Sequence, residues 1–251
     1  MDPYFTRLPF QKYLFGKVTP NRALAAQLVP CCNFVLVTHC HFDHFLDVPE
    51  ILLNTKAECL GSSSTCRLLS IFKIPNSQVR EVQVGDQHQL GNFKVEVCKS
   101  QHVRIPGVRP GMISGHLQPP LKAGQYKMDQ IFSYRISIGE SSVLTDPGLS
   151  AEGKPSSILL TTPYLHPQKY EQMIMMIKPT TVILTHWDDF FRPLSKPLRP
   201  NLHPPSLALP LRIRVDLIRF KEMIREISPA TRVLVPELFK SYPIDALSGI
   251  Q

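Results

Sequence analysis

Several features that mark specialised classes of protein are missing from this sequence. Its six cysteines form no C-x-x-C pair, no uninterrupted apolar run could span a bilayer, and no Lys or Arg residues stand next to one another in its most basic stretch. These absences argue against a disulfide framework and a transmembrane helix. Residues 1–14 mix charged and polar side chains among the aromatic ones and therefore lack a signal-peptide core. We expect a cytoplasmic protein with reduced thiols.

The composition is that of an ordinary globular protein. Hydrophobic residues make up 43% and charged residues 19% of the 251 residues, which is enough for one sizeable core, and we expect a single domain over 1–251. The net charge of +8 is scattered along the chain. A basic surface attracts anionic molecules, so we expect a small anionic substrate. We do not expect nucleic acid as a partner, and the sequence leaves the oligomeric state open.

Short apolar strands alternate with amphipathic helices, which is typical of an α/β protein. The runs NFVLVT (33–38) and TVILT (181–185) predict strands buried on both faces. Asp47, followed by Pro49 and Glu50, predicts a helix start with Asp47 as the N-cap. The period-two alternation in 79–84 and 93–98 predicts two half-exposed strands joined through glycine turns.

Two segments have little periodicity. Residues 103–126 are rich in Pro and Gly, and we interpret them as a long active-site loop, because long ordered loops are often functional. Residues 192–210 are rich in Pro and predict an irregular connection.

Residues that can bind a metal are concentrated in the segment Thr38-His39-Cys40-His41-Phe42-Asp43-His44. It places three histidines and an aspartate within six residues, directly after a predicted strand. Imidazole and carboxylate are ligands for zinc, iron and manganese. Crowding them would be costly unless a cation compensated, so the segment predicts a metal site. Further residues with metal chemistry follow other apolar strands: His102, Asp146 and His186.

The pattern H-x-H-x-D-H at a strand end resembles the signature of the metallo-β-lactamase superfamily. Later residues match the remaining family motifs in order: a lone histidine, an aspartate in T-D-P-G and a histidine in T-H-W-D-D. Within the superfamily, the chain is similar to the bacterial metal-dependent hydrolases that include L-ascorbate-6-phosphate lactonase and the N-acylphosphatidylethanolamine phospholipase D group. The resemblance implies an α/β (α+β) fold, the four-layer αββα sandwich.

The resemblance also implies the metal ligands. His39, His41 and His102 would hold one divalent ion, Asp43, His44 and His186 a second, and Asp146 would bridge the two. We expect zinc, with manganese or iron as alternatives. Two such ions would activate a bridging water as a hydroxide, which Asp43 would orient, and the protein would be a hydrolase of a small ester, lactone or phosphoester.

Other polar residues are candidates for further roles. His166 follows a predicted strand and is a candidate proton donor to the leaving group. Arg109 and His116 lie in the long loop and are candidates for binding a substrate anion. One alternative function is a nuclease or phosphodiesterase acting on nucleic acid, which the positive charge favours. The other is a binding or redox module with structural metals or a di-iron centre, which the lack of a flavodoxin-like extension disfavours.

The sequence departs from the family at its beginning. Family members usually open with an antiparallel strand pair that leads into a segment similar to Asp2-Pro3-Tyr4-Phe5, whereas here Met1 immediately precedes this segment. We therefore expect the sandwich without its N-terminal β-hairpin, or a start site placed late in the pattern.

Overall fold

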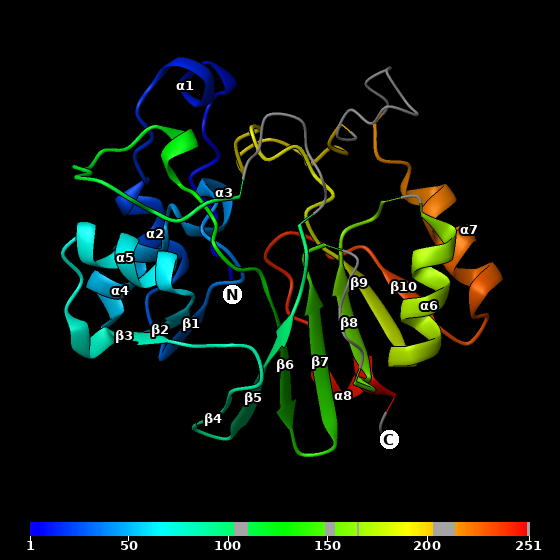
Figure 1. Ribbon diagram of the computed structural model, residues 1–251. Coiled ribbons are helices and arrows are strands. Elements are labelled where there is room, and N and C mark those ends of the chain that lie inside the picture. The colour runs from blue at the N-terminus through cyan, green and yellow to red at the C-terminus, as the bar shows by residue number, and fades with distance from the viewer. Residues whose placement is uncertain (103–109, 149–153, 165, 203–213, 250–251) are drawn as a thin grey trace. The chain divides into compact units, whose positions relative to one another are not determined.

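The computed structural model of the protein has two compact units, each built around its own sheet (Figure 1). The first unit comprises Met1–Gln83, Gly107–Ile131 and Phe190–Leu198, and the second comprises Val84–Pro106, Phe132–Asp189 and Arg199–Gln251. The structure describes residues 1–102, 110–148, 154–164, 166–202 and 214–249. The predicted mixed α/β character is confirmed in both units.

The first unit contains a parallel three-stranded sheet in the order β1-β2-β3. Its strands are β1 (Phe34–Leu36), β2 (Glu58–Gly61) and β3 (Val79–Glu81). Helices supply the crossovers that parallel strands require. The helices of this unit are α1 (Phe10–Phe15), α2 (Arg22–Leu28), α3 (Phe42–Phe45), α4 (Val48–Thr55), α5 (Ser63–Ile71) and the 3₁₀ helices η1 (Asn76–Gln78) and η2 (Ala123–Gln125).

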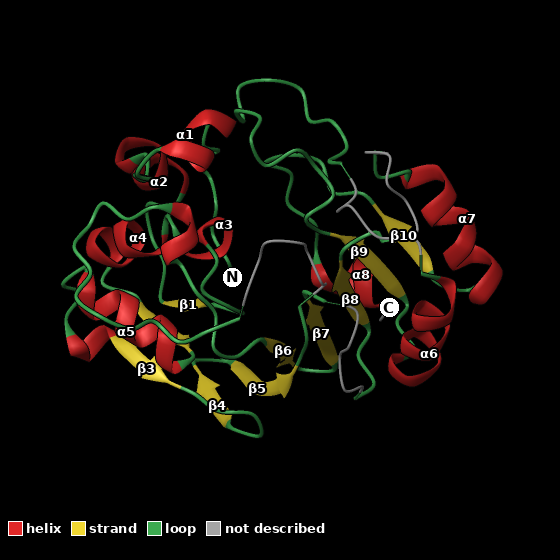
Figure 2. Ribbon diagram, turned by 45° about the horizontal axis from the view of Figure 1, so that its top comes forward, coloured by secondary structure: helices red, strands yellow, loops and turns green. Residues whose placement is uncertain are grey.

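The second unit contains a seven-stranded mixed sheet in the order β10-β9-β8-β7-β6-β5-β4. Its strands are β4 (Gln87–Leu90), β5 (Phe93–Lys99), β6 (Phe132–Ile138), β7 (Ser141–Asp146), β8 (Ile158–Thr161), β9 (Thr181–Leu184) and β10 (Arg232–Leu234). Figure 2 shows α6 (Pro167–Ile177) and α7 (Leu217–Ile227) side by side, and α8 (Ile244–Ser248) follows near the end of the chain.

Strand direction in this sheet brings three strand ends to one edge. β5 and β7 are both antiparallel to β6 and therefore run the same way. β8 and β9 are parallel to β7 and to each other. The carboxyl ends of β5, β7 and β9 consequently lie at the same edge of the sheet, which is where ligands gather in α/β proteins.

The two segments with period-two alternation form strands that belong to different sheets. The alternation in 79–84 and 93–98 predicted two half-exposed strands; β3 pairs with β2, while β5 pairs with β4 and β6. Residues 87–90 form a strand, β4, that the sequence reading treated as part of a turn. A period of two reports that one face of a strand is half exposed, and it does not identify the partner strand.

Each unit has its own apolar core. In the first, side chains of β1, α3 and α4, such as Val35, Phe45 and Leu52, pack with residues of the 110–126 segment. In the second, α6 and α7 cover one face of the sheet, and the Tyr170 and Phe220 rings meet edge to face 4.9 Å apart. Among the described residues, no helix combines the length and the apolar character needed to cross a membrane.

Asp47 begins α4 as predicted, but its side chain does not cap that helix. The buried carboxylate instead accepts hydrogen bonds from the backbone N–H groups of Phe5 (2.6 Å) and Thr6 (2.9 Å), and also from the Thr6 hydroxyl. Burial raises the pKa of Asp47 above its ordinary value, although these three donors oppose the shift. The carboxylate therefore holds the segment after Asp2 against the first unit.

Replacing Asp47 tests this attachment. We expect Asp47→Ala to lower the free energy of unfolding by about 3 kcal/mol, because buried amides would lose a charged acceptor. Chemical denaturation measures this change, and faster hydrogen exchange at the Phe5 and Thr6 amides would locate it. Asp86→Ala is the control, since the side chain of Asp86 is 42% exposed. Equal unfolding midpoints for the two variants would contradict the assignment.

Candidate metal centre

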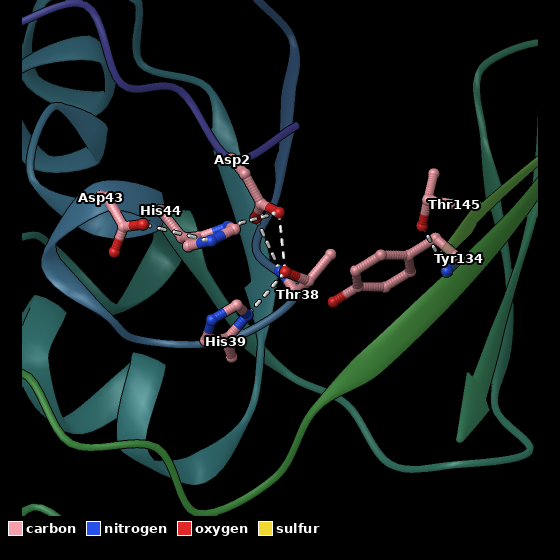
Figure 3. Close-up of polar contacts among 7 residues, drawn as sticks. All are labelled: Asp2, Thr38, His39, Asp43, His44, Tyr134 and Thr145. Atoms are coloured by element: carbon pink, nitrogen blue, oxygen red, sulfur yellow. Dashed lines mark hydrogen bonds and ion pairs between the residues drawn. The ribbon is translucent and has the colours of Figure 1, made fainter. Parts of the chain in front are cut away.

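The H-x-H-x-D-H segment forms a tight turn after β1 that leads into α3 (Figure 3). The His39 ring lies 4.8 Å from the His41 ring and 3.9 Å from the His44 ring, measured between centroids. Nitrogens of His39 and His41 approach within 4.8 Å of each other. The Nε2 atom of His44 is 3.7 Å from a carboxylate oxygen of Asp43. The turn thus gathers all four candidate ligands of the first unit.

The peptide geometry of the turn explains this gathering. β1 ends at Leu36, and α3 begins at Phe42, with His41 in extended conformation as its N-cap. Phe42 and Phe45 are buried in the core of the unit, so the intervening Asp43 and His44 are directed away from it. Cys40 is also buried, with its sulfur 3.0 Å from the Thr65 hydroxyl, so this thiol packs into the unit.

Asp2 connects to two of the histidines, although it is 36 residues before Thr38 in the chain (Figure 3). Its carboxylate accepts the Thr38 N–H at 2.8 Å and the Thr38 hydroxyl at 2.6 Å. The same carboxylate lies 3.0 Å from Nδ1 of His44. The Thr38 oxygen is in turn 3.0 Å from Nδ1 of His39.

These hydrogen bonds assign the tautomers of both rings. Because the Thr38 hydroxyl gives its proton to Asp2, it accepts a hydrogen bond from Nδ1–H of His39. The carboxylate of Asp2 can only accept, so Nδ1 of His44 is a donor as well. In the neutral form of both rings the lone pair then resides on Nε2, which is the form of imidazole that binds a metal. One acidic side chain thereby orients a histidine expected at each of the two metal positions.

The electrostatics of His44 follow from the same neighbours. Burial by itself lowers the pKa of His44, but the carboxylates of Asp43 and Asp2 outweigh it and raise this pKa above its ordinary value. A strongly negative environment around the imidazole is one that also favours a bound cation. Imidazole nitrogens and a carboxylate are ligands that zinc, iron and manganese accept, so the residues of the turn fit divalent metal ions.

The second unit presents its candidate ligands at one sheet edge. His102 lies three residues beyond the end of β5, Asp146 is the last residue of β7, and His186 lies two residues beyond β9. The Asp146 side chain is buried, and its Oδ1 accepts hydrogen bonds of 3.4 Å from the Ser100 hydroxyl and the Gly148 N–H. His186 has a φ of +53°, a left-handed conformation that is costly for a residue with a Cβ and that clusters at functional sites.

The T-D-P-G sequence ends in glycine, at Gly148, because another part of the backbone approaches it closely. A Cβ atom at this position would lie 1.4 Å from the carbonyl oxygen of Gln101 and 3.3 Å from Cα of His102. Only a residue without a side chain permits this approach of two backbones. The approach sets the His102 segment directly against the segment that carries Asp146.

The remaining candidates are found on exposed segments or lie outside the described residues. His166 is exposed and is the N-cap residue of α6. His116 is exposed, with its ring nitrogen 3.2 Å from the side-chain amide of Gln118. Arg109 lies outside the described residues, as do parts of the predicted segments 103–126 and 192–210. Their proposed roles stay predictions.

Sequence reasoning missed Asp2 and Thr38 as parts of the site. The available signal was the Asp2-Pro3-Tyr4-Phe5 segment, which is similar to the family pattern but has no local feature that connects it with the histidines. In the structure, the N–H of Asp2 also donates to the Leu36 carbonyl at 3.0 Å, which attaches the segment to β1.

Comparison with known proteins supports the fold more strongly than the activity. The chain is similar to Igni18, a metallo hydrolase from Ignicoccus hospitalis, with a TM-score of 0.53 and 15% identity over 94% of this chain and 85% of that one. It is also similar to a possible metal-dependent hydrolase from Veillonella parvula, with a TM-score of 0.50 and 13% identity over 85% of this chain and 76% of that one. The chain has the metallo-β-lactamase fold expected from the sequence.

Sequence relatives cover a smaller part of the chain. A UPF0173 protein from Pyrococcus furiosus is 34% identical over 70 residues, and one from Pyrococcus abyssi is 33% identical over 70 residues. Each match spans 28% of this chain and 32% of the relative, so the chain matches about a third of the length of these proteins. No family model matches the chain.

The first test of this site concerns Asp2. We expect Asp2→Asn to weaken metal binding by about 10- to 100-fold, because an amide cannot accept from both Thr38 and His44 as the carboxylate does. Competition with a chromogenic chelator measures the affinity. Asp245→Asn, an exposed acidic residue in the first turn of α8, is the control. Metal affinity equal to that of the unmodified protein would refute the positioning role.

The second test concerns the backbone approach at Gly148. We expect Gly148→Ala to lower metal content and thermal stability together, since the added methyl group collides with the carbonyl of Gln101. Gly124→Ala should change neither quantity, because a Cβ at Gly124 would meet no atom within 4 Å. Elemental analysis and thermal melting of both variants decide the matter, and full metal content in Gly148→Ala would contradict the packing argument.

Proposed function

We propose that the protein is a metal-dependent hydrolase that acts on a small anionic ester, lactone or phosphoester. The observation that carries the proposal is the turn at 39–44, where four residues with metal chemistry gather and the tautomers of His39 and His44 are set by Asp2 and Thr38. Purely structural histidines would not require this arrangement. The fold, which is shared with Igni18, is consistent with the proposal.

We further propose that three residues of the second unit complete a dinuclear centre. His39, His41 and His102 would hold one divalent ion, Asp43, His44 and His186 the other, and Asp146 would bridge them. Three features of the second unit support the assignment: the common sheet edge, the backbone approach at Gly148 and the left-handed conformation of His186. Zinc fits this set of ligands, with manganese or iron as alternatives.

The roles of the protein side chains follow from their chemistry. Bound at this centre, the two ions would polarise the scissile group and make a nearby water more acidic. Asp43 would orient that water by accepting one of its protons in a hydrogen bond. His166 would donate a proton to the leaving group. His116 and Arg109 would bind the negative charge of the substrate. The link to the ascorbate-phosphate lactonase group and the cytoplasmic location are further proposals, the latter because the cysteines are all free thiols.

Cleavage of nucleic acid is the second candidate function. The net charge of +8 favours it, as does the uneven distribution of charge at the start of the chain, where four basic residues and no acidic one stand between Asp2 and Asp43. Binding to phosphates would weaken steeply with salt, whereas hydrolysis of a small ester would not.

The test combines metal removal with a ligand variant. We expect EDTA to abolish hydrolysis of 4-nitrophenyl acetate or bis(4-nitrophenyl) phosphate, and added zinc to restore it. His41→Ala should lose metal and at least about 100-fold of the activity while remaining folded, because a ligand to one ion is removed. His88→Ala, a histidine of β4 outside the proposed ligand set, should retain both.

Two results would contradict this proposal. Full metal content in His41→Ala, measured by elemental analysis, would refute the ligand assignment. Metal-dependent cleavage of single-stranded RNA or DNA, without hydrolysis of the nitrophenyl substrates and with binding that falls steeply as salt rises, would favour the nuclease instead.

A further inference from the structure

A polar hollow lies on the second unit, over the end of the sheet that β4, β5 and β6 form. It has a volume of about 410 Å³ and is also lined by the segment that precedes β8. Figure 1 shows α6 and α7 beside β8, β9 and β10, at the other end of this sheet. We name this feature the sheet hollow. Its polar lining consists of Gln87, Lys94, Glu96, Arg135, Ser137 and Lys154.

The register of the strands explains why these side chains share one face of the sheet. Glu96 of β5 is paired with Gln87 of β4 and with Arg135 of β6, and Lys94 is paired with Ser137. Paired residues of antiparallel strands project to the same face, and so do residues two apart along one strand. Lys94 and Arg135 are diagonal neighbours, which lie about 7–8 Å apart in such a sheet.

The sheet hollow is separate from the edge that carries the candidate metal ligands. Lys94 is the second residue of β5 and Ser137 the last but one of β6, so the hollow extends from the amino end of β5. His102 instead follows the carboxyl end of β5. Because β5 has seven residues, its two ends are about 20 Å apart. No residue that lines the hollow belongs to the proposed ligand set.

The guanidinium group of Arg135 is held in place by three acceptors. Its Nε donates to the Pro155 carbonyl at 3.1 Å and to the Ser156 hydroxyl at 3.2 Å, and its Nη1 donates to the Ser137 hydroxyl at 3.1 Å. Within the described parts of the chain, Nη2 and the second N–H of Nη1 have no acceptor. These two nitrogens form a fork that can bind a carboxylate or a phosphate bidentately.

The charges of the sheet hollow do not cancel. Lys154 forms an ion pair with Glu96, whose side chain is only 13% exposed. Lys94 is exposed, and its ammonium group has no ion pair among the residues that the structure describes. Three cationic groups and one carboxylate leave a net charge of +2. Exposed lysines alone would indicate a solvated surface, but here they flank a hollow and an arginine that is already oriented.

The arrangement of these charges favours an anion with two separate charged groups. Glu96 stands directly opposite Arg135 in the sheet, so its carboxylate would repel a doubly charged group at Arg135 more than a singly charged one. A dicarboxylate divides its charge. One planar carboxylate fits the fork of Arg135, and the other reaches the ammonium of Lys94. The polar side chains of Gln87 and Ser137 leave room for a short chain between the two.

We infer that the sheet hollow binds a short-chain dicarboxylate, with one carboxylate on the guanidinium of Arg135 and the other on the ammonium of Lys94. This binding site is additional to the candidate metal centre. The inference does not rest on the proposed hydrolase function, because it involves neither a metal ligand nor turnover. Arg135 provides the oriented anchor, and Lys94 provides the second charge that distinguishes a dicarboxylate from a monocarboxylate.

An NMR titration of the zinc-loaded protein tests the inference and locates the site. The probes are malonate, succinate and glutarate, with acetate as the single carboxylate and sulfate as a compact dianion of equal charge. We expect the dicarboxylates to shift the amide signals of Lys94, Glu96 and Arg135. The best of them should bind at least about tenfold more tightly than acetate, since joining two carboxylates makes the second contact intramolecular. Sulfate should bind less tightly than that dicarboxylate.

Two variants separate the roles of the cations. Lys94→Gln should fold normally, because the side chain is exposed, and it should lower the affinity for the best dicarboxylate to about that for acetate. Arg135→Lys keeps the charge but lacks the planar fork. It should weaken acetate and the dicarboxylates alike by at least about tenfold, because a charge-assisted hydrogen bond is lost.

The matched control is Lys221→Gln, which removes the same charge from an exposed position on α7. α7 contacts β10, which is five strand spacings from β5, or about 24 Å. At that distance solvent ions screen the charge, so all affinities should stay within about twofold. Equal weakening by Lys221→Gln and Lys94→Gln would show that only the net charge matters and would overturn the inference.

Other results would also refute the dicarboxylate site. Equal affinity for acetate and all three dicarboxylates would do so, as would tighter binding of sulfate than of every dicarboxylate. His41→Ala separates this inference from the proposed function, because it removes a candidate metal ligand and should leave the signal shifts at Lys94 and Arg135 unchanged. Loss of these shifts in His41→Ala would assign dicarboxylate binding to the metal centre and leave the hydrolase proposal standing.

Discussion

The carboxylate of Asp2 is the group on which the geometry of the metal-binding turn depends. It is only 13% exposed, and it accepts hydrogen bonds from the backbone and hydroxyl of Thr38 and from Nδ1 of His44. Through Thr38 it also determines the tautomer of His39. Without this acceptor, Thr38 and His44 would lose a charged partner, and the two imidazoles could adopt tautomers that present N–H to the metal position. A residue far from the histidines in sequence therefore governs their chemistry.

The negative charges of Asp2 and Asp43 make the turn a favourable place for a cation. Asp2 and Asp43 both act on His44, and their attraction for its proton outweighs the cost of its burial. Metal binding would displace that proton, so affinity and protonation are coupled. Asp47 plays a different part nearby, since it is buried and holds the backbone of Phe5 and Thr6. The segment is thus attached by the side chain of Asp2 at one point and by that of Asp47 at Phe5 and Thr6.

Core packing and chemistry share residues in this protein. Phe42 is a core residue of the first unit, and it stands between the candidate ligands His41 and Asp43 in the turn. In the second unit, Gly148 serves close packing against Gln101, and the same contact sets the Asp146 segment beside His102. Substitutions at such positions would affect stability and function together.

The sequence by itself determined those features that depend on covalent spacing. Three histidines and an aspartate within six residues must lie close together, so the candidate ligands at 39–44 followed from the sequence alone. Apolar, β-branched runs likewise predicted β1 and β9, and the order Asp47, Pro49, Glu50 predicted the start of α4. Only the tertiary structure decided which distant groups meet: that Asp2 orients His39 and His44, that Asp47 binds Phe5 and Thr6 instead of capping α4, and that β3 pairs with β2. These contacts join residues separated by long loops, and their formation depends on total burial and chain closure, which no local pattern of residues records.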